Sequence, residues 1–135
     1  MKQEFKIISD FIEKNTRVLD VGCGDGTLME YLKTNKEIDI RGIEISKSNS
    51  QKCVSKGLTV IEGDAEKDLT QFPDSSFDFV VLSQTLQAFL NPEIVIQELL
   101  RVGKKSHCYS AKFWILESKT SFINQRNNAY YKKST

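Results

Sequence analysis

The sequence predicts an α/β protein, a Rossmann-like three-layer domain in which helices cover both faces of a parallel sheet. Along residues 1–105, short apolar runs typical of strands alternate with segments of helical periodicity. The run at 18–21 ends in three glycines spaced two apart. These are Gly22, Gly24 and Gly26, and a helical pattern starts directly after them. Such a strand, tight turn and helix start bring bare main-chain N–H groups close to a ligand.

The first half of the chain predicts two helices and two strands. Apolar residues at helical spacing indicate a first helix that ends near residues 14–15; they are Phe5, Ile8, Phe11 and Ile12. The apolar run before the glycines predicts a strand over about 17–21, and a helix is expected over about 27–34. Alternation of isoleucines around Glu44 predicts the second strand, over about 39–45.

The second half continues the alternation. A helix is expected over about 47–56 and a strand over 58–61. The segment 77–82 is apolar apart from one aspartate, which suits a parallel strand that is covered on both faces. Asn91 followed by proline is typical of a helix start and predicts a helix to about residue 102.

The pattern breaks after Lys105. Residues 106–135 contain no Gly, Pro, Val or Asp, and neither strand nor helix periodicity is sustained there. We therefore expect an incomplete sheet of about four strands that lacks its C-terminal strands. The expected organisation is a partial domain over 1–105 and an anomalous tail over 106–135 that is not natively folded.

Composition excludes several function classes. Of the 135 residues, 39% are apolar and 27% are charged, and the net charge of +1 leaves no large basic field for nucleic acid. No apolar run is long enough to span a membrane, and the N-terminus lacks the pattern of a signal peptide. The three cysteines are far apart, which is neither a disulfide framework nor a zinc spacing. We expect a cytoplasmic protein without a metal site.

Acidic residues follow or end the first three strands, where right-handed crossovers place the ligand crevice. Asp20 lies just before the glycines and either anchors the loop or accepts a hydrogen bond from a cationic amino group; the two roles are compatible. Glu44 lies 22 residues after Gly22, the position at which a carboxylate accepts ribose hydroxyls. The alternative for Glu44 is a solvated glutamate at the strand end. Asp64 is placed to accept a hydrogen bond from the adenine amine. Glu62 and Glu66 are close by, so the choice of Asp64 for this role is not unique.

Together these residues predict a site for one nucleoside that carries a charged amino acid. Ser83 is expected at the far wall of the crevice, with a simple polar loop residue as the alternative. Cys23 is interpreted as a small residue that fits a tight space rather than as a reactive thiol. No catalytic residue is assigned. The expected cofactor-binding residues are Asp20, Gly22, Cys23, Gly24, Gly26, Glu44, Ile45, Gly63, Asp64, Ala65 and Ser83.

These motifs resemble class I S-adenosylmethionine-dependent methyltransferases and, more narrowly, the MetW family. The resemblance covers about residues 10–105, and its specific part is Ser-Gln-Thr-Leu-Gln at 83–87. It implies S-adenosyl-L-methionine as cofactor, with methionine bound at the glycine loop, and homoserine O-acyltransferase as partner in bacterial methionine biosynthesis. Two roles stay open: a methyltransferase-like protein, or a non-catalytic subunit that activates the acyltransferase. A nicotinamide-dependent oxidoreductase is disfavoured because the glycine spacing is G-x-G-x-G.

The same resemblance suggests an origin for the tail. If each codon from Lys105 on is read one base later, suitable synonymous codons spell a sequence that looks like the continuation of the family. We therefore hypothesise a frameshift that leaves residues 106–135 out of frame and the domain truncated. Such a chain would expose strand 77–82 as an apolar edge, and its activity is expected to be weak or absent.

Overall fold

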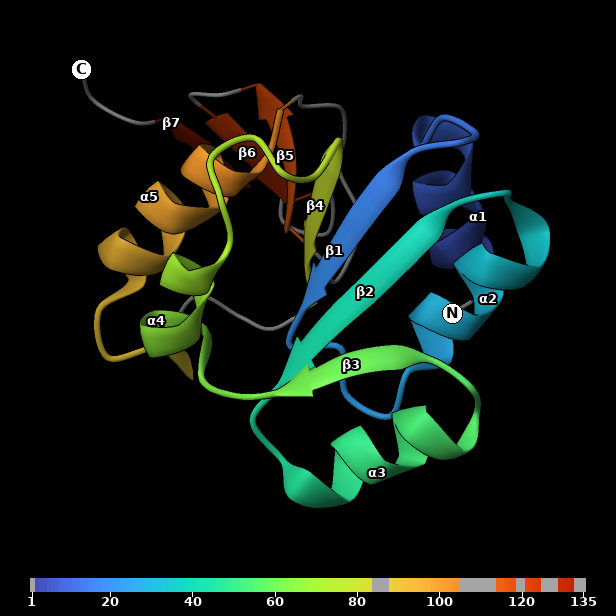
Figure 1. Ribbon diagram of the computed structural model, residues 1–135. Coiled ribbons are helices and arrows are strands. Elements are labelled where there is room, and N and C mark those ends of the chain that lie inside the picture. The colour runs from blue at the N-terminus through green and yellow to red at the C-terminus, as the bar shows by residue number, and fades with distance from the viewer. Residues whose placement is uncertain (1, 84–87, 105–113, 119–120, 125–128, 133–135) are drawn as a thin grey trace.

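The computed structural model (Figure 1) describes residues 2–83, 88–104, 114–118, 121–124 and 129–132. The helices are α1 Lys2–Phe11, α2 Thr27–Asn35, α3 Lys47–Ser55, α4 Ala65–Asp68, the 3₁₀ turn η1 Leu69–Gln71 and α5 Pro92–Val102. The strands are β1 Arg17–Val21, β2 Asp39–Glu44, β3 Thr59–Glu62, β4 Phe79–Leu82, β5 Trp114–Ser118, β6 Ser121–Asn124 and β7 Ala129–Lys132. Within these residues, no helix combines the length and the apolar character needed to cross a bilayer.

The first four strands form the predicted parallel sheet. Their order is β3-β2-β1-β4, and β1 pairs in parallel with both β2 and β4. The strand order therefore reverses beside β1, because the chain moves outward to β3 and then returns to the other side of β1 to form β4. In open α/β sheets a reversal of this kind opens a crevice at the carboxyl ends of the strands.

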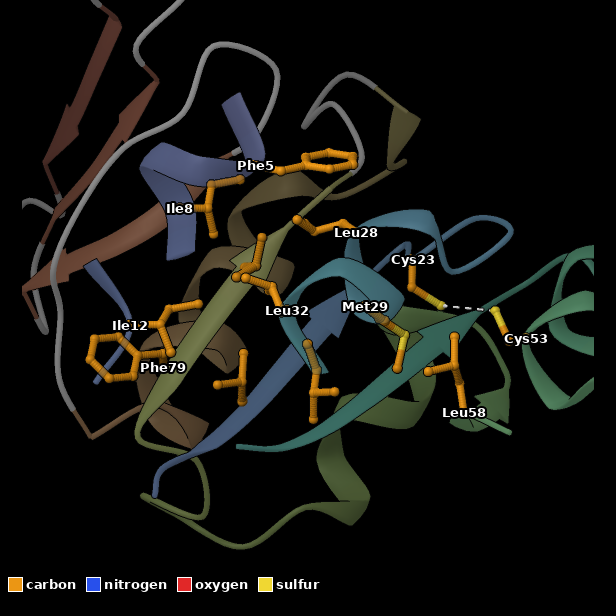
Figure 2. Close-up of a cluster of buried hydrophobic side chains, with 13 residues drawn as sticks. Phe5, Ile8, Ile12, Cys23, Leu28, Met29, Leu32, Cys53, Leu58 and Phe79 are labelled. Atoms are coloured by element: carbon orange, nitrogen blue, oxygen red, sulfur yellow. Dashed lines mark hydrogen bonds between the residues drawn. The ribbon is translucent and has the colours of Figure 1, made fainter. Parts of the chain in front are cut away.

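Helices lie on both sides of the sheet and make three layers (Figure 1). A buried cluster of side chains fills the space on each side. One cluster joins α1, α2 and part of α3 to the sheet, and Figure 2 shows its side chains. The other joins α4, η1 and α5 to the opposite face. β1 serves both: Val18 belongs to the first cluster, whereas Leu19 and Val21 belong to the second. This two-sided burial explains the near-continuous apolar character of the strand.

The expectation that the sheet lacks C-terminal strands is wrong. β5 pairs antiparallel with β4, and β6 and β7 extend the sheet to seven strands. These segments are only four or five residues long but rich in aromatic and β-branched residues, which favour extended backbone. The antiparallel pairs β5–β6 and β6–β7 also have only short connections, so the helix-and-strand alternation used for the prediction does not apply to β6 and β7. β5 follows α5, as the alternation requires. β4 is accordingly not an edge strand.

Smaller differences concern residues between the predicted elements. The strand expected over 77–82 begins at Phe79, while Phe77 forms an isolated bridge with Gly103. The sequence did not predict α4 or η1, because elements of four and three residues are too short to show periodicity. The frameshift and the domain boundary at residue 105 stay predictions.

Candidate functional site

The glycine loop between β1 and α2 is built from left-handed backbone. Gly22, Gly24 and Gly26 have φ angles of 73°, 60° and 85°, a region that residues with a Cβ rarely adopt. The three glycines differ in what surrounds them. A Cβ at Gly24 would meet nothing within 4 Å, whereas one at Gly26 would approach Leu58 Cδ1 to 2.6 Å. The space beside the Gly24 Cα is thus open, although the Gly24 N–H and carbonyl are held by Glu44 and Cys53. Gly26 lets the start of α2 pack closely against Leu58 and Cys53.

Asp20 is the most unusual residue of the site. Its side chain is fully buried at the end of β1; the Ser83 hydroxyl donates to Oδ1, and Oδ2 has no hydrogen-bond partner among the described residues. The pKa of Asp20 is raised to about 7, chiefly because burial disfavours its charged form; the hydrogen bond from Ser83 opposes this rise, and the nearby charge of Glu44 adds to it. A buried acceptor of this kind requires a donor, either a proton or a cationic group on a ligand.

Glu44 braces the loop from the end of β2. Its side chain is only 8% exposed, so the alternative of a solvated glutamate is wrong. Oε1 accepts a hydrogen bond from the Gly24 N–H at 2.8 Å, and Oε2 accepts one from the Ser46 N–H at 2.8 Å. A carboxylate has about four acceptor positions, so each oxygen can accept one further donor, such as a ribose hydroxyl.

Asp64 is the N-cap of α4. Its Oδ1 accepts from the Glu66 N–H at 3.0 Å, and its own N–H donates to Asp68 Oδ2 at 2.7 Å. The neighbouring Gly63 N–H donates to the Glu44 carbonyl at 2.9 Å, which ties the ends of β2 and β3 together. One oxygen of Asp64 is therefore committed to the cap, and Oδ2 is the atom left for an exocyclic amine.

A cavity of about 220 Å³ lies at these strand ends. It brings together predicted residues from three strand ends: Gly22, Ile45, Gly63, Asp64 and Ala65. The other residues around it are Ile43, Glu66, Ala88, Phe89 and Leu90. The other predicted site residues do not line this cavity; they are Asp20, Cys23, Gly24, Gly26, Glu44 and Ser83.

The sequence did not identify the wall formed by residues 88–90. Phe89 and Leu90 precede the helix cap Asn91, and Leu90 is 91% exposed. The exposure of Leu90 is visible only in the structure, so the sequence offered no signal for this wall. The predicted motif residues 84–87 lie outside the described residues.

Cys23 packs inside the loop, as its size suggested. It is 6% exposed, and its Sγ lies 4.0 Å from Cys53 Sγ of α3 (Figure 2). Burial raises the pKa of the Cys23 thiol far above its usual value, which suppresses the thiolate. The Cys53 thiol also donates to the Gly24 carbonyl at 3.2 Å. Both thiols thus pack against the glycine loop, and neither is placed to act as a nucleophile.

Comparison with known proteins places these features in a family. A family model described as "Methionine biosynthesis protein MetW" matches residues 2–123, which extends beyond the break at Lys105. The chain is 33% identical over 105 residues to the "Bifunctional methionine biosynthesis protein MetXA/MetW" of Rhodopirellula baltica, an alignment that covers 72% of this chain and 17% of that protein. It is 30% identical over 109 residues to ajmaline N-methyltransferase of Rauvolfia serpentina, covering 73% and 36%.

Solved structures give the same fold. A SAM-dependent methyltransferase from Archaeoglobus fulgidus superposes with a TM-score of 0.70 at 25% identity, over 78% of this chain and 48% of that one. A possible histamine N-methyltransferase from Thermotoga maritima gives 0.63 at 28% identity, over 76% and 46%. The chain spans less than half the length of each of these relatives and structures.

Proposed function

Because the chain belongs to the MetW family of methionine biosynthesis proteins, we propose that it binds S-adenosylmethionine at the carboxyl ends of β1, β2 and β3. One observation carries the proposal: a buried carboxylate oxygen, Asp20 Oδ2, lacks a partner among the described residues directly before a loop of left-handed glycines. The α-amino group in the methionine part of S-adenosylmethionine supplies the missing donor. The open space beside the Gly24 Cα leaves room for the same part of the ligand.

Each part of the ligand has a residue of suitable chemistry. Asp20 accepts a hydrogen bond from the amino group, and the remaining lone pairs of the Glu44 carboxylate accept hydrogen bonds from the ribose hydroxyls. Asp64 Oδ2 takes the adenine amine, while Ile45, which is 62% exposed, offers an apolar face for the adenine ring. When bound, the sulfonium supplies an electrophilic methyl group, so that positioning an acceptor is the main task left to the protein.

Gly24→Ala tests the site. The new Cβ points into open space, so the variant is expected to fold, with a loss of about 1–2 kcal/mol from the left-handed backbone. In the proposed site that Cβ takes up space needed by the amino-acid part of the ligand, and we expect the affinity for S-adenosylhomocysteine to fall at least tenfold by calorimetric titration. Gly57→Ala is the matched control, because Gly57 has a φ of 77° and equally empty surroundings, away from the site.

The proposal fails if the wild-type chain does not bind S-adenosylhomocysteine. It also fails if Gly24→Ala and Gly57→Ala bind the nucleoside equally well. A parallel titration with NAD separates this site from a nicotinamide site, and no heat of binding is expected there, because the glycine spacing differs from the nicotinamide fingerprint.

A second role is favoured by one relative. The Rhodopirellula baltica protein is named as MetXA and MetW in a single chain, which supports a physical association between a MetW-type domain and a second methionine-biosynthesis protein. We propose homoserine O-acyltransferase as the partner, with this chain as an activating subunit. Co-expression is expected to give a complex that co-elutes, and the acyltransferase rate is expected to rise severalfold over the enzyme alone. Separate elution together with an unchanged rate would contradict this role.

A further inference from the structure

Ser83 is fixed at the end of β4 by two contacts with β1. Its backbone N–H donates to the Val21 carbonyl at 2.9 Å, and its hydroxyl donates to Asp20 Oδ1, across 63 residues of sequence. Because Asp20 lies opposite Val81 in the register of β1 and β4, the two side chains meet where these strands end. The hydroxyl therefore has a defined direction and a single described acceptor.

We propose that Ser83 is a positioning residue, whose hydroxyl holds one oxygen of Asp20 so that the other stays available for the amino group of the bound nucleoside. This rests on the proposed function and deepens it. A carboxylate that can rotate freely presents either oxygen to either donor, whereas a carboxylate held at Oδ1 keeps Oδ2 in one place. Ser83 thus acts through Asp20 instead of forming the wall of the crevice that its sequence position suggested.

The surroundings of Asp20 make this hydrogen bond important. The Glu44 carboxylate on β2 is the nearby charge that acts on Asp20. The neighbouring thiols are Cys23 on the glycine loop and Cys53 on α3. No lysine or arginine forms an ion pair with Asp20 in the described part of the chain. Ser83 is then the group within that part that stabilises the ionised form, which is the form that a cationic amino group requires.

Ser83→Ala separates positioning from packing. Without the hydroxyl, ionisation of Asp20 becomes harder, and the pH midpoint of S-adenosylhomocysteine binding is expected to rise by about one unit. Affinity at pH 7 then falls about fivefold, while affinity at pH 9 changes little. Binding of 5′-methylthioadenosine, which has no amino acid, is expected to stay within twofold. Ser83→Thr keeps the hydroxyl and restores the wild-type profile.

The matched control is Ser76→Ala, since the Ser76 hydroxyl is also buried but has no hydrogen-bond partner within the described residues. It is expected to leave both nucleoside affinities unchanged. An unchanged pH midpoint in Ser83→Ala overturns the positioning role, as does an equal loss of both nucleosides. A wild-type chain that binds neither nucleoside overturns the proposed function itself. If Ser83→Ala folds poorly, ¹³C NMR titration of the Asp20 carboxyl in Ser83→Thr decides, and a midpoint above that of wild type overturns the proposal.

Discussion

Asp20→Asn is expected to stabilise the unliganded protein at pH 8 and to weaken binding of the nucleoside at least tenfold. The carboxylate is fully buried, and its pKa is raised from 3.8 to about 7. At pH 8 the folded protein must therefore hold a charge that it disfavours by up to about 4 kcal/mol. Asparagine removes that charge, while its amide oxygen still accepts from the Ser83 hydroxyl.

The gain in stability has a defined pH dependence. Because folding raises the pKa of Asp20, this residue does not destabilise the fold below about pH 4. Its unfavourable contribution grows as the pH rises toward 7 and is constant above that. The difference in free energy of unfolding between Asp20→Asn and wild type should follow the same course. Urea denaturation at pH 4, 6 and 8 measures it.

The loss of binding follows from the same atom. Hydrogen bonds to charged groups contribute about 1.5–3 kcal/mol, so losing the carboxylate should weaken S-adenosylhomocysteine roughly 10- to 150-fold. Asp39→Asn is the control: the same chemical change at the start of β2, on an exposed residue that pairs with Arg17 and Arg41. It is expected to change neither property substantially. Undiminished binding by Asp20→Asn would remove the main support for the proposed site.

Gly26→Ala is expected to be the most destabilising single-methyl change in the glycine loop. Its φ of 85° disfavours any residue with a Cβ by about 1–2 kcal/mol. The new methyl would also lie 2.6 Å from Leu58 Cδ1 and 3.0 Å from Cys53 Sγ, and both side chains are buried. Overpacking of this kind adds about 1–3 kcal/mol, so a total of about 2–5 kcal/mol is expected from chemical denaturation.

Gly57→Ala shares the left-handed backbone but not the contact, because nothing lies within 4 Å of its Cβ. It should lose only the first of these two contributions. The difference between the variants therefore measures how tightly the loop at Gly26 packs against Cys53 and Leu58. Equal destabilisation would show that the contact relaxes freely and that backbone conformation alone accounts for the glycine at 26.

The sequence was most informative where a pattern is local. The glycine loop, the first four strands and the MetW family were predicted correctly, because strand runs and glycine spacing are visible within a few residues. Contacts that join distant segments were not visible. The bond from Ser83 to Asp20 spans 63 positions, and the bond from the Gly24 N–H to Glu44 spans 20. Only the reversal of strand order beside β1 brings the first pair together.

The two amide groups held by Glu44 have a consequence for how a ligand meets this protein. The glycine loop, whose glycines give it high backbone freedom, is already fixed at Gly24 by a side chain of β2 before anything binds. The second amide, that of Ser46, holds the Glu44 carboxylate in place. The conformational entropy of the loop is lost during folding rather than at association, so the site is preorganised. Glu44→Gln keeps an acceptor for only one of those amides. The loop of the variant must then become ordered as the nucleoside binds, so the nucleoside is expected to associate more slowly with it than with the wild-type chain. Stopped-flow measurement of the association rate tests this.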